Sequence, residues 1–371
     1  MRLLFVIDNL STGGAQRQMV NLAVTLQQRG HRITLFRYAP GDLLADRLGR
    51  SSVEVISCYK RARYSPDVIC ALREMMRRGQ YDVALSYLAT PNFYLLTAAL
   101  GLRLRPKIVV SERSCDPPTG PTRREAWLRQ LYRGADLVVT NSHHQRENFQ
   151  RRYRWLADRV VTIYNGIDLV EFCPPASEPP PEPLRLLAIG SVSPYKNGLC
   201  LIEALAILRD TEQLQPQVDW VGQRVHSLQE RAEYLARMEQ VIAELGLTSQ
   251  WNWLDQRRDV VELLHQHHAL VHASYWEGLP NVVCEALACG RPVLVSNVLD
   301  HPRLVQAGVS GYLFDWREPR SLADSIVKLQ RMTAVERHVM GQQGREFAEQ
   351  HLSETRFADE YEELFRALAA R

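Results

Sequence analysis

The densest group of residues that could do chemistry lies between positions 276 and 292, where Glu277 and Glu285 are separated by seven residues. Ionised carboxylates are strong hydrogen-bond acceptors, so two of them on neighbouring segments can hold the hydroxyl groups of a sugar and of a ribose. Between them, Gly278 marks a turn and Pro280 starts a predicted helix, 280–289, at the one helical position where a missing N–H costs nothing.

The start of this predicted helix is a second feature with binding chemistry. Its exposed amides and the positive end of the helix dipole favour an anion, and a diphosphate would fit there. The segment that forms it comprises Gly278, Leu279, Pro280, Asn281 and Val282. Taken singly, each glutamate is more commonly a solvated helix charge, so the prediction depends on the combination.

Lys196 is the next candidate, because the chain has only four lysines among its 45 basic residues. It follows a predicted strand, 185–190, together with Gly190 and Ser191. A lone lysine is usually a solvated surface charge. A lysine in a chain that elsewhere uses arginine favours a specific role for this position.

The first half of the chain offers two further candidate loops. Gly13 and Gly14 lie between a predicted strand, 3–7, and a predicted helix, 15–29, where residues without a Cβ let backbone amides approach an anion. Their spacing is not G-x-G-x-x-G, which disfavours a nicotinamide dehydrogenase. Glu112 and Arg113 end another predicted strand and begin a loop rich in proline and glycine, 114–121, a position suited to an acceptor site, although many such loops merely connect.

Short apolar runs alternate with helical patterns in both halves, which predicts an α/β protein with two Rossmann-like β/α/β domains facing each other across a cleft. The predicted strands are 3–7, 32–36, 53–56, 83–86, 108–111, 137–140 and 160–163, then 185–190, 218–221, 250–254, 270–273, 293–296 and 311–314. The predicted domains are 1–174 and 184–350, joined by a proline-rich linker, 175–183, with a C-terminal helix, 351–371, packing back toward the N-terminal domain.

Composition excludes several classes of protein. No apolar run approaches the roughly 20 residues of a transmembrane helix, and the N-terminus lacks the features of a signal peptide, so we expect a cytoplasmic protein. Seven scattered cysteines without a C-x-x-C pair favour free thiols and argue against a zinc site. The histidines, among them His265, His268 and His272, lack a carboxylate that completes a metal shell, so we predict no metal and no cofactor.

Charge is distributed unevenly along the chain. Residues 1–166 contain 26 Lys and Arg against 13 Asp and Glu, whereas the remainder contains 19 against 29. A basic first domain is compatible with contact with anionic lipid at the inner face of a membrane, and scattered solvated arginine is an equally good explanation. We expect no nucleic-acid partner.

The segment E-G-L-P-N-V-V-C-E-A-L-A-C-G-R-P-V resembles the signature of retaining glycosyltransferases of the large group 1, family 4-like class with the GT-B fold. The likeness extends over nearly the whole chain, including 135–142, 164–168 and 189–197. It implies that Glu277 contacts the donor sugar, Glu285 the nucleotide ribose and Lys196 the diphosphate. It also implies that Gly13 and Gly14 face the donor phosphates and the acceptor.

Two positions depart from the family pattern. The family has an arginine five residues before the lysine, where this chain has Ser191, and Arg291 or Arg113 are the candidate replacements. Many relatives have a histidine near Glu112 and Arg113. The pair found here resembles a variant in transferases that extend lipid-linked oligosaccharides, in which Arg113 would bind an acceptor phosphate and Glu112 would assist the acceptor hydroxyl.

These features predict transfer of a hexose or N-acetylhexosamine from a nucleotide diphosphate sugar, with a UDP-sugar favoured, to a glycan or lipid-linked saccharide. Two alternatives stay open. One is an enzyme like the UDP-N-acetylhexosamine epimerases, which acts on the donor without an acceptor. The other is a non-catalytic nucleotide-sugar-binding protein, which the loss of the arginine at Ser191 makes conceivable.

Overall fold

The computed structural model describes the chain except for residues 12, 63–64, 114, 117–119, 181, 225–226 and 371. The described residues form two compact units. Unit 1 comprises Met1–Gly166 and Glu354–Arg371, and unit 2 comprises Ile167–Ser353. The predicted linker, 175–183, belongs to unit 2, and its residue 181 lies outside the described part, as do residues 114 and 117–119 of the predicted acceptor loop.

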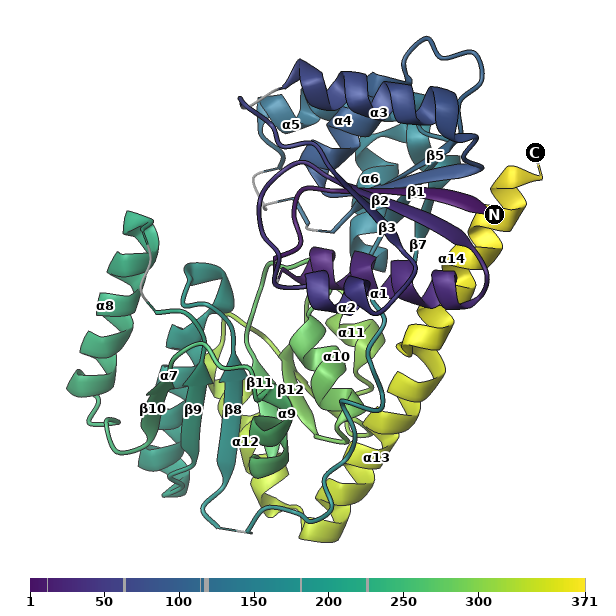
Figure 1. Cartoon of the computed structure of the whole chain (residues 1–371). Coiled ribbons are helices and arrows are strands. Elements are labelled where there is room, and N and C mark those ends of the chain that lie inside the picture. The colour runs from purple at the N-terminus through teal and green to yellow at the C-terminus, as the bar shows by residue number, and fades with distance from the viewer. Residues whose placement is uncertain are drawn as a thin grey trace. The chain divides into compact units, whose positions relative to one another are not determined.

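Unit 1 is a seven-stranded parallel sheet with helices on both faces (Figure 1). Its strand order is β3-β2-β1-β4-β5-β6-β7, so the order of succession reverses between β1 and β4. Its elements are β1 (Arg2–Ile7), α1 (Gly14–Gln28), β2 (Arg32–Arg37), α2 (Ala45–Gly49), β3 (Glu54–Ser57), α3 (Pro66–Gly79), β4 (Val83–Tyr87), α4 (Ala89–Ala99), β5 (Lys107–Glu112), α5 (Arg123–Leu128), η1 (Arg129–Gly134), β6 (Leu137–Thr140), α6 (His143–Arg152), η2 (Arg154–Arg159), β7 (Val160–Thr162) and α14 (Glu354–Ala369).

The side chains of β1 explain why both faces need covering. Successive residues of a strand point to opposite faces. Leu3 and Phe5 therefore pack into one apolar cluster with α1 and α14, whereas Leu4 and Val6 pack into another with α3 and α4. A strand that is apolar at every position is stable only between two layers of helix, which is the doubly wound arrangement that the sequence predicts.

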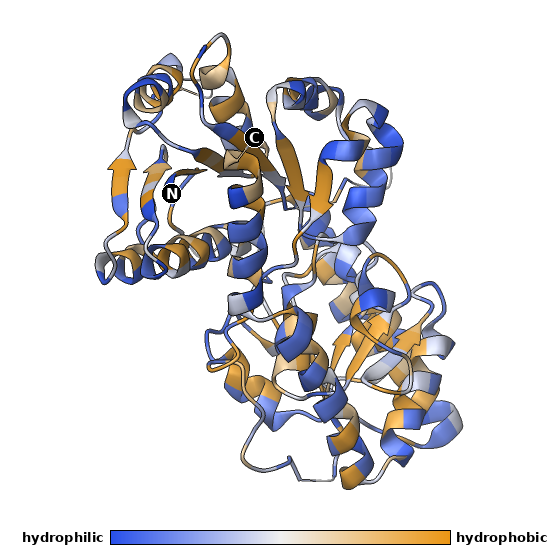
Figure 2. Cartoon of the chain, turned by 90° about the vertical axis from the view of Figure 1, so that its right-hand side faces the viewer, coloured by the Kyte–Doolittle hydropathy of each residue, from blue (hydrophilic) through white to orange (hydrophobic). Residues whose placement is uncertain are grey.

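Unit 2 is a six-stranded parallel sheet of order β10-β9-β8-β11-β12-β13, and its succession reverses between β8 and β11. Its elements are β8 (Arg185–Ile189), η3 (Pro194–Lys196), α7 (Gly198–Ile207), η4 (Leu208–Glu212), β9 (Gln217–Val221), α8 (Gln229–Glu244), β10 (Trp251–Leu254), α9 (Val260–Gln266), β11 (Ala269–His272), α10 (Asn281–Ala288), β12 (Val293–Ser296), α11 (His301–Leu304), β13 (Gly311–Phe314), α12 (Pro319–Arg331) and α13 (Ala334–His351). Every strand predicted from the sequence is present. Figure 2 shows the strands as largely hydrophobic, with hydrophilic residues on the helices.

The proline-rich segment is attached to unit 2 by polar contacts. Glu178 accepts a hydrogen bond of 2.6 Å from Arg291 and lies 2.9 Å from His338 Nδ1. Gln330 donates to Glu182 at 2.7 Å. These contacts hold the segment against α12, α13 and Arg291, which follows α10. Among the described residues, every helix is too short or too polar to span a bilayer.

Helix α14 joins the core of unit 1 although nearly 200 residues separate it from Gly166. Its buried residues, Phe357, Ala358, Tyr361, Phe365 and Leu368, repeat at intervals of three and four and so form one apolar face. Phe365 lies with its ring centroid 6.3 Å from that of Phe5 in β1. The burial of this apolar face in the core of unit 1 explains why the last helix belongs to that unit.

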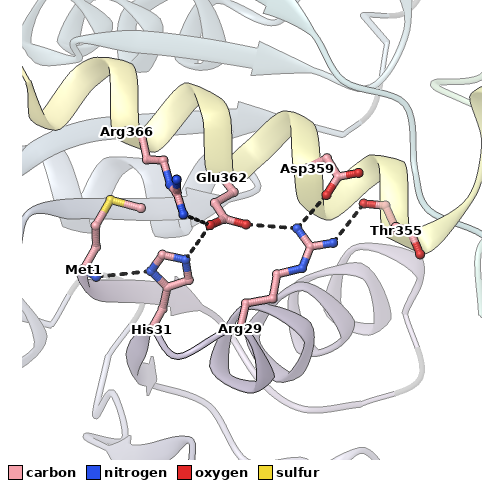
Figure 3. A network of polar contacts seen from close by, with 7 residues as sticks. All are labelled: Met1, Arg29, His31, Thr355, Asp359, Glu362 and Arg366. Carbon is pink, nitrogen blue, oxygen red and sulfur yellow. Dashed lines mark hydrogen bonds and ion pairs between the residues drawn. The ribbon is translucent and has the colours of Figure 1, made fainter.

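A polar network fixes the other side of α14 (Figure 3). Glu362 lies 3.0 Å from His31 Nε2, accepts a hydrogen bond of 3.0 Å from Arg29 and pairs with Arg366, while Arg29 also lies 2.7 Å from Asp359. Burial alone would raise the pKa of Glu362, but these hydrogen bonds outweigh it and lower the pKa to about 2. The ionised carboxylate is thus the centre of the contact between α14 and the end of α1.

We expect Glu362→Gln to lower the stability of unit 1 by about 1 kcal/mol at pH 7, or about 2–4 °C in Tm, because solvent screens a partly exposed carboxylate. A lowered pKa in the folded state stabilises the protein above the ordinary value near 4.5 and loses that effect as the pH falls toward 2. The difference from wild type should therefore shrink between pH 5 and pH 2. Glu363→Gln, an exposed position on the same helix, is the matched control for thermal unfolding followed by circular dichroism. Equal losses in both variants at pH 7 would contradict the prediction.

Candidate functional site

The candidate site of unit 2 lies where its sheet reverses direction. Neighbouring strands β8 and β11 run in parallel, and the connections that follow them lead to opposite sides, which leaves the carboxyl ends of both strands accessible. Lys196 ends the short helix η3 that follows β8, and Glu277 lies in the turn that follows β11. The topology thus brings together two residues that are 81 positions apart.

Three groups converge on one oxygen of Glu277. Lys196 Nζ donates to Oε1, Ser274 Oγ donates to the same oxygen at 2.8 Å, and His272 Nε2 lies 3.0 Å from it. None of these contacts involves Oε2. The side chain is 15% exposed, so it presents one fixed carboxylate oxygen to the protein and leaves the other for a ligand.

The charge of Glu277 is stabilised by its neighbours. Burial would raise its pKa, but the Lys196 ammonium and the His272 ring outweigh burial and hold the pKa well below its ordinary value. Glu277 is therefore ionised at neutral pH and acts as a hydrogen-bond acceptor only. This is the form that binds sugar hydroxyl groups.

Two buried histidines support the pair. Burial lowers the pKa of His272, and burial followed by the neighbouring His272 ring lowers the pKa of His301 to about 3, so both rings are neutral at pH 7. The two rings lie 5.4 Å apart at 81°. His301 Nδ1 lies 2.8 Å from the carbonyl oxygen of Ser296, whose hydroxyl donates to the carbonyl of Ser274. From the sequence, His272 was a candidate only for a metal site, and the one signal for its role here is its place five residues before Glu277.

Close backbone approach explains two glycines in this site. Gly190 has φ +155°, and a Cβ there would lie 2.7 Å from Cε of Lys196. Gly222 has φ +153°, and a Cβ there would lie 2.1 Å from the carbonyl oxygen of Gly190. A side chain at Gly190 would push the Lys196 side chain aside, and one at Gly222 would displace the backbone of Gly190. Gly190 is therefore needed for packing against the lysine.

Helix α10 begins one residue later than predicted. Pro280 has φ −76° and ψ 89° and is the capping residue, so the helix starts at Asn281 and Pro280 is not its first residue. The turn from Gly278 to Val282 leads into this helix from β11. Glu285 lies on it and is 4% exposed, whereas a helical glutamate of unknown context is more often solvated. Ser191 follows Gly190 and is half-buried, and Arg291 pairs with Glu178 at the other end of α10.

Aromatic rings, which no sequence motif indicated, lie next to Lys196 and Glu277 in the chain. Tyr195 precedes Lys196 and lies 4.4 Å, centroid to centroid, from Trp276, which precedes Glu277. Tyr275 stacks on Trp316 at 4.5 Å with an angle of 23° between the rings. The loops after β8, β11 and β13 therefore supply partly buried aromatic rings, two of them adjacent in sequence to Lys196 and Glu277.

Unit 1 contains the predicted acceptor-side residues. Gly13 is the capping residue of α1 and Gly14 is the first residue of that helix, directly after the carboxyl end of β1. Glu112 ends β5 and is buried, and Arg113 follows it, with its guanidinium carbon 3.9 Å from the centroid of the Tyr87 ring. These residues follow strands β1, β4 and β5, which are consecutive in the sheet.

Glu112 is the acceptor in a buried network. Arg129 Nε donates to its Oε1 at 3.2 Å, and the hydroxyl of Tyr132 donates to the same oxygen. Arg129 also lies 2.6 Å from Asp116. A structural role for Glu112 is therefore evident, and its role toward an acceptor hydroxyl stays a prediction. Among the residues that the structure describes, no group of three His, Cys, Asp or Glu is arranged to hold a metal ion.

Comparison with known proteins agrees with this architecture. Residues 12–171 match the model of Glycosyltransferase Family 4, and residues 171–347 match that of Glycosyl transferases group 1. The Campylobacter jejuni GalNAc-alpha-(1->4)-GalNAc-alpha-(1->3)-diNAcBac-PP-undecaprenol alpha-1,4-N-acetyl-D-galactosaminyltransferase is 25% identical over 77% of this chain and 77% of its own length. The structure of Anabaena HepE in complex with UDP and glucose has a TM-score of 0.81 at 21% identity and covers 99% of this chain and 100% of that chain.

A D-inositol 3-phosphate glycosyltransferase of Mycolicibacterium vanbaalenii is 28% identical over 56% of this chain. The chain spans about half the length of that relative, 48%. The two family models follow one another without a gap and correspond to the two sheets described above. The fold is GT-B, and the chain belongs to the group 1 glycosyltransferases, with a family 4 domain preceding the group 1 domain.

Proposed function

We propose that the chain is a retaining glycosyltransferase that moves a hexose or N-acetylhexosamine from a nucleotide diphosphate sugar to a glycan or lipid-linked saccharide. The observation that carries this proposal is the partly buried pair of Lys196 and Glu277 at the sheet reversal of unit 2. The Lys196 ammonium and the Glu277 carboxylate are in direct contact, which suits a ligand that has a diphosphate next to a polyol.

The diphosphate would bind between Lys196 and the first turn of α10. The amides of that turn point out of the helix, and the dipole adds positive potential. Lys196 would then share its three donors between Glu277 and the phosphate oxygens. Because the departing nucleotide diphosphate gains charge as the glycosidic bond breaks, this arrangement stabilises the transition state more than the bound donor.

Glu277 would position the donor sugar. The fixed oxygen Oε1 orients the carboxylate, and Oε2 would accept a hydroxyl of the sugar. Glu285, on α10, would accept a hydrogen bond from a ribose hydroxyl. With no carboxylate assigned as a nucleophile, we propose front-face departure of the leaving group with attack by the acceptor from the same side, which retains the anomeric configuration.

A UDP-sugar is the favoured donor, and a lipid-linked saccharide is a favoured acceptor. HepE binds UDP-glucose in one of its crystal structures, and the Campylobacter relative acts on a saccharide linked through a diphosphate to undecaprenol. A lipid-linked acceptor also suits a basic unit 1 in which Trp127 is exposed next to Arg123 and Arg124. We propose peripheral contact of this unit with an anionic membrane from the cytoplasmic side.

We expect Glu277→Gln to lower kcat/KM for transfer by about 10²- to 10³-fold, because the amide keeps the shape of the side chain but loses the charge that orders the sugar. Binding of free UDP should stay within about threefold of wild type, since UDP lacks the transferred sugar that Glu277 would contact. Initial rates of UDP release and isothermal titration with UDP measure the two effects. Glu239→Gln, exposed on α8, is the matched control. Transfer at the wild-type rate by Glu277→Gln would refute the proposal.

Lys196→Gln should produce the complementary pattern. Loss of the ammonium should weaken UDP binding by about tenfold and also lower the rate, because the same charge contacts the diphosphate in the ground state and the transition state. Comparing the affinities for UDP and for uridine isolates the contribution of the diphosphate to binding. An unchanged ratio of the two affinities would exclude Lys196 from the diphosphate site.

The proposed enzyme needs no metal. We expect transfer to proceed at the same rate within twofold after exhaustive treatment with EDTA, because Lys196 and the α10 amides would supply the positive charge. The same assay without an acceptor tests the epimerase-like alternative. Turnover of the donor that is independent of acceptor would favour that alternative over transfer.

A further inference from the structure

Two cysteines of unit 2 that are far apart in the chain lie on backbone segments in contact with each other. Cys173 follows Phe172 in the segment that begins unit 2, and Cys289 is the capping residue at the end of α10. Cys173 is exposed, whereas Cys289 is fully buried, and both are free thiols in the structure. The proposed donor site uses neither thiol.

The residues that precede the two cysteines are held together by one arginine. Helix α13 packs against α10 and carries this arginine, Arg345. Its Nη1 donates to the carbonyl oxygen of Phe172 at 2.7 Å and to that of Ala288 at 2.7 Å. The two carbonyl oxygens therefore lie within two hydrogen-bond lengths of each other. Nη2 of the same arginine donates to the carbonyl of Leu169 at 3.2 Å, which is a second attachment of the first segment.

The residues that follow the two cysteines are also in contact. Gly290 has φ +63°, and a Cβ placed there would lie 3.5 Å from Cγ of Pro174. Because the flanking residues on both sides make contact, Cys173 and Cys289 lie at the same level of the two segments. His265 Nε2, 2.7 Å from the carbonyl oxygen of Cys173, is a further contact that fixes the backbone there.

The two thiols differ in reactivity. Burial, followed by the charges of Cys173 and Glu285, raises the pKa of Cys289 to about 12, although Arg291 and Arg345 act in the opposite direction. An effect of one thiol on the pKa of another is expected only when their sulfur atoms are close together. The thiolate is the reactive form of cysteine, and an exposed thiol meets a reagent first. We therefore expect Cys173 to react before Cys289.

We propose that Cys173 and Cys289 are the site of a reversible disulfide, which forms when the chain meets a low-molecular-weight disulfide such as glutathione disulfide. A disulfide needs Cα atoms about 4.4–6.8 Å apart, a separation that two backbone segments in contact supply. The bond would join the segment that begins unit 2 to the end of α10, the helix that carries Glu285. This inference is independent of the proposed donor and acceptor.

The reaction has two steps. The Cys173 thiolate attacks one sulfur of glutathione disulfide, so that a mixed disulfide forms and one glutathione leaves as a thiolate, which takes up a proton. The Cys289 thiol then loses its proton to solvent and attacks the sulfur of Cys173, which releases the second glutathione. Two protein thiols are thus oxidised to one disulfide, and one glutathione disulfide is reduced to two glutathione thiols.

The first experiment locates the bond in the full chain. The folded protein is incubated with glutathione disulfide until the reaction reaches equilibrium, its remaining thiols are alkylated in denaturant, and its proteolytic peptides are compared by mass spectrometry with and without reduction. We expect Cys173 and Cys289 in one linked peptide that reduction separates. Cys70→Ser, which removes an exposed thiol of unit 1, is the matched control and should form the same linked peptide. Absence of this peptide from the wild type would overturn the inference.

The second experiment tests the order of the two steps. In Cys289→Ala, a small apolar side chain fills the buried position, and Cys173 should stop at the mixed disulfide, which is detected as a stable mass increase on that residue. In the wild type, the same mixed disulfide should decay as the linked peptide appears. A mixed disulfide that persists equally in both proteins would refute the pairing of the two thiols.

The third experiment measures the consequence for stability. The bond closes a loop of more than a hundred residues, which restricts the unfolded chain. Oxidised wild type should therefore unfold with a Tm about 5 °C or more above that of the reduced protein, and dithiothreitol should reverse the shift. Cys173→Ser, treated in the same way, should show no shift. The same shift in Cys173→Ser, or none in the wild type, would contradict the inference.

Discussion

The contact between Lys196 and Glu277 is the interaction on which the geometry of unit 2 depends. Both residues lie on loops, and their positions follow from the pairing of β8 with β11. Gly190 keeps the backbone close enough for the lysine to reach the carboxylate, and Ser274 and His272 hold the same carboxylate oxygen. Behind the pair, Ser274 donates to Glu277, the Ser296 hydroxyl donates to the carbonyl of Ser274, and His301 Nδ1 lies beside the carbonyl of Ser296. A chain of polar contacts thus connects the pair to the interior of unit 2.

The two units use one topology for opposite electrostatic purposes. At the reversal of its sheet, unit 2 pairs the Lys196 ammonium with the Glu277 carboxylate. At the corresponding place, unit 1 has the Arg113 guanidinium, which packs on the Tyr87 ring and forms no ion pair with a residue that the structure describes. The uneven distribution of charge along the chain, basic in residues 1–166 and acidic after them, agrees with a first unit that recognises anions by direct positive charge.

Helix α14 is attached to unit 1 by two kinds of contact. Its apolar face, which includes Phe357, Tyr361 and Phe365, packs into the core of that unit. Its Glu362 joins the helix to Arg29 and His31 at the end of α1 by polar contacts. The return of the chain to unit 1 through its last helix thus completes that core.

The amino-acid sequence by itself determined the elements, because apolar runs of strand length and amphipathic helical patterns are local properties. It placed all the strands, and the motif from Glu277 to Glu285 indicated one side of the site and the family. It did not determine which side chains meet. The pairing of Lys196 with Glu277, the support from His272, the burial of Glu285 and the aromatic rings around them follow from the order of strands in the sheet, which short-range patterns do not encode. The contrast between Arg129 and Arg113 is the clearest case. Only the three-dimensional arrangement of Glu112 and Asp116 decides that Arg129 has two carboxylate partners, whereas Arg113 has none among the residues that the structure describes.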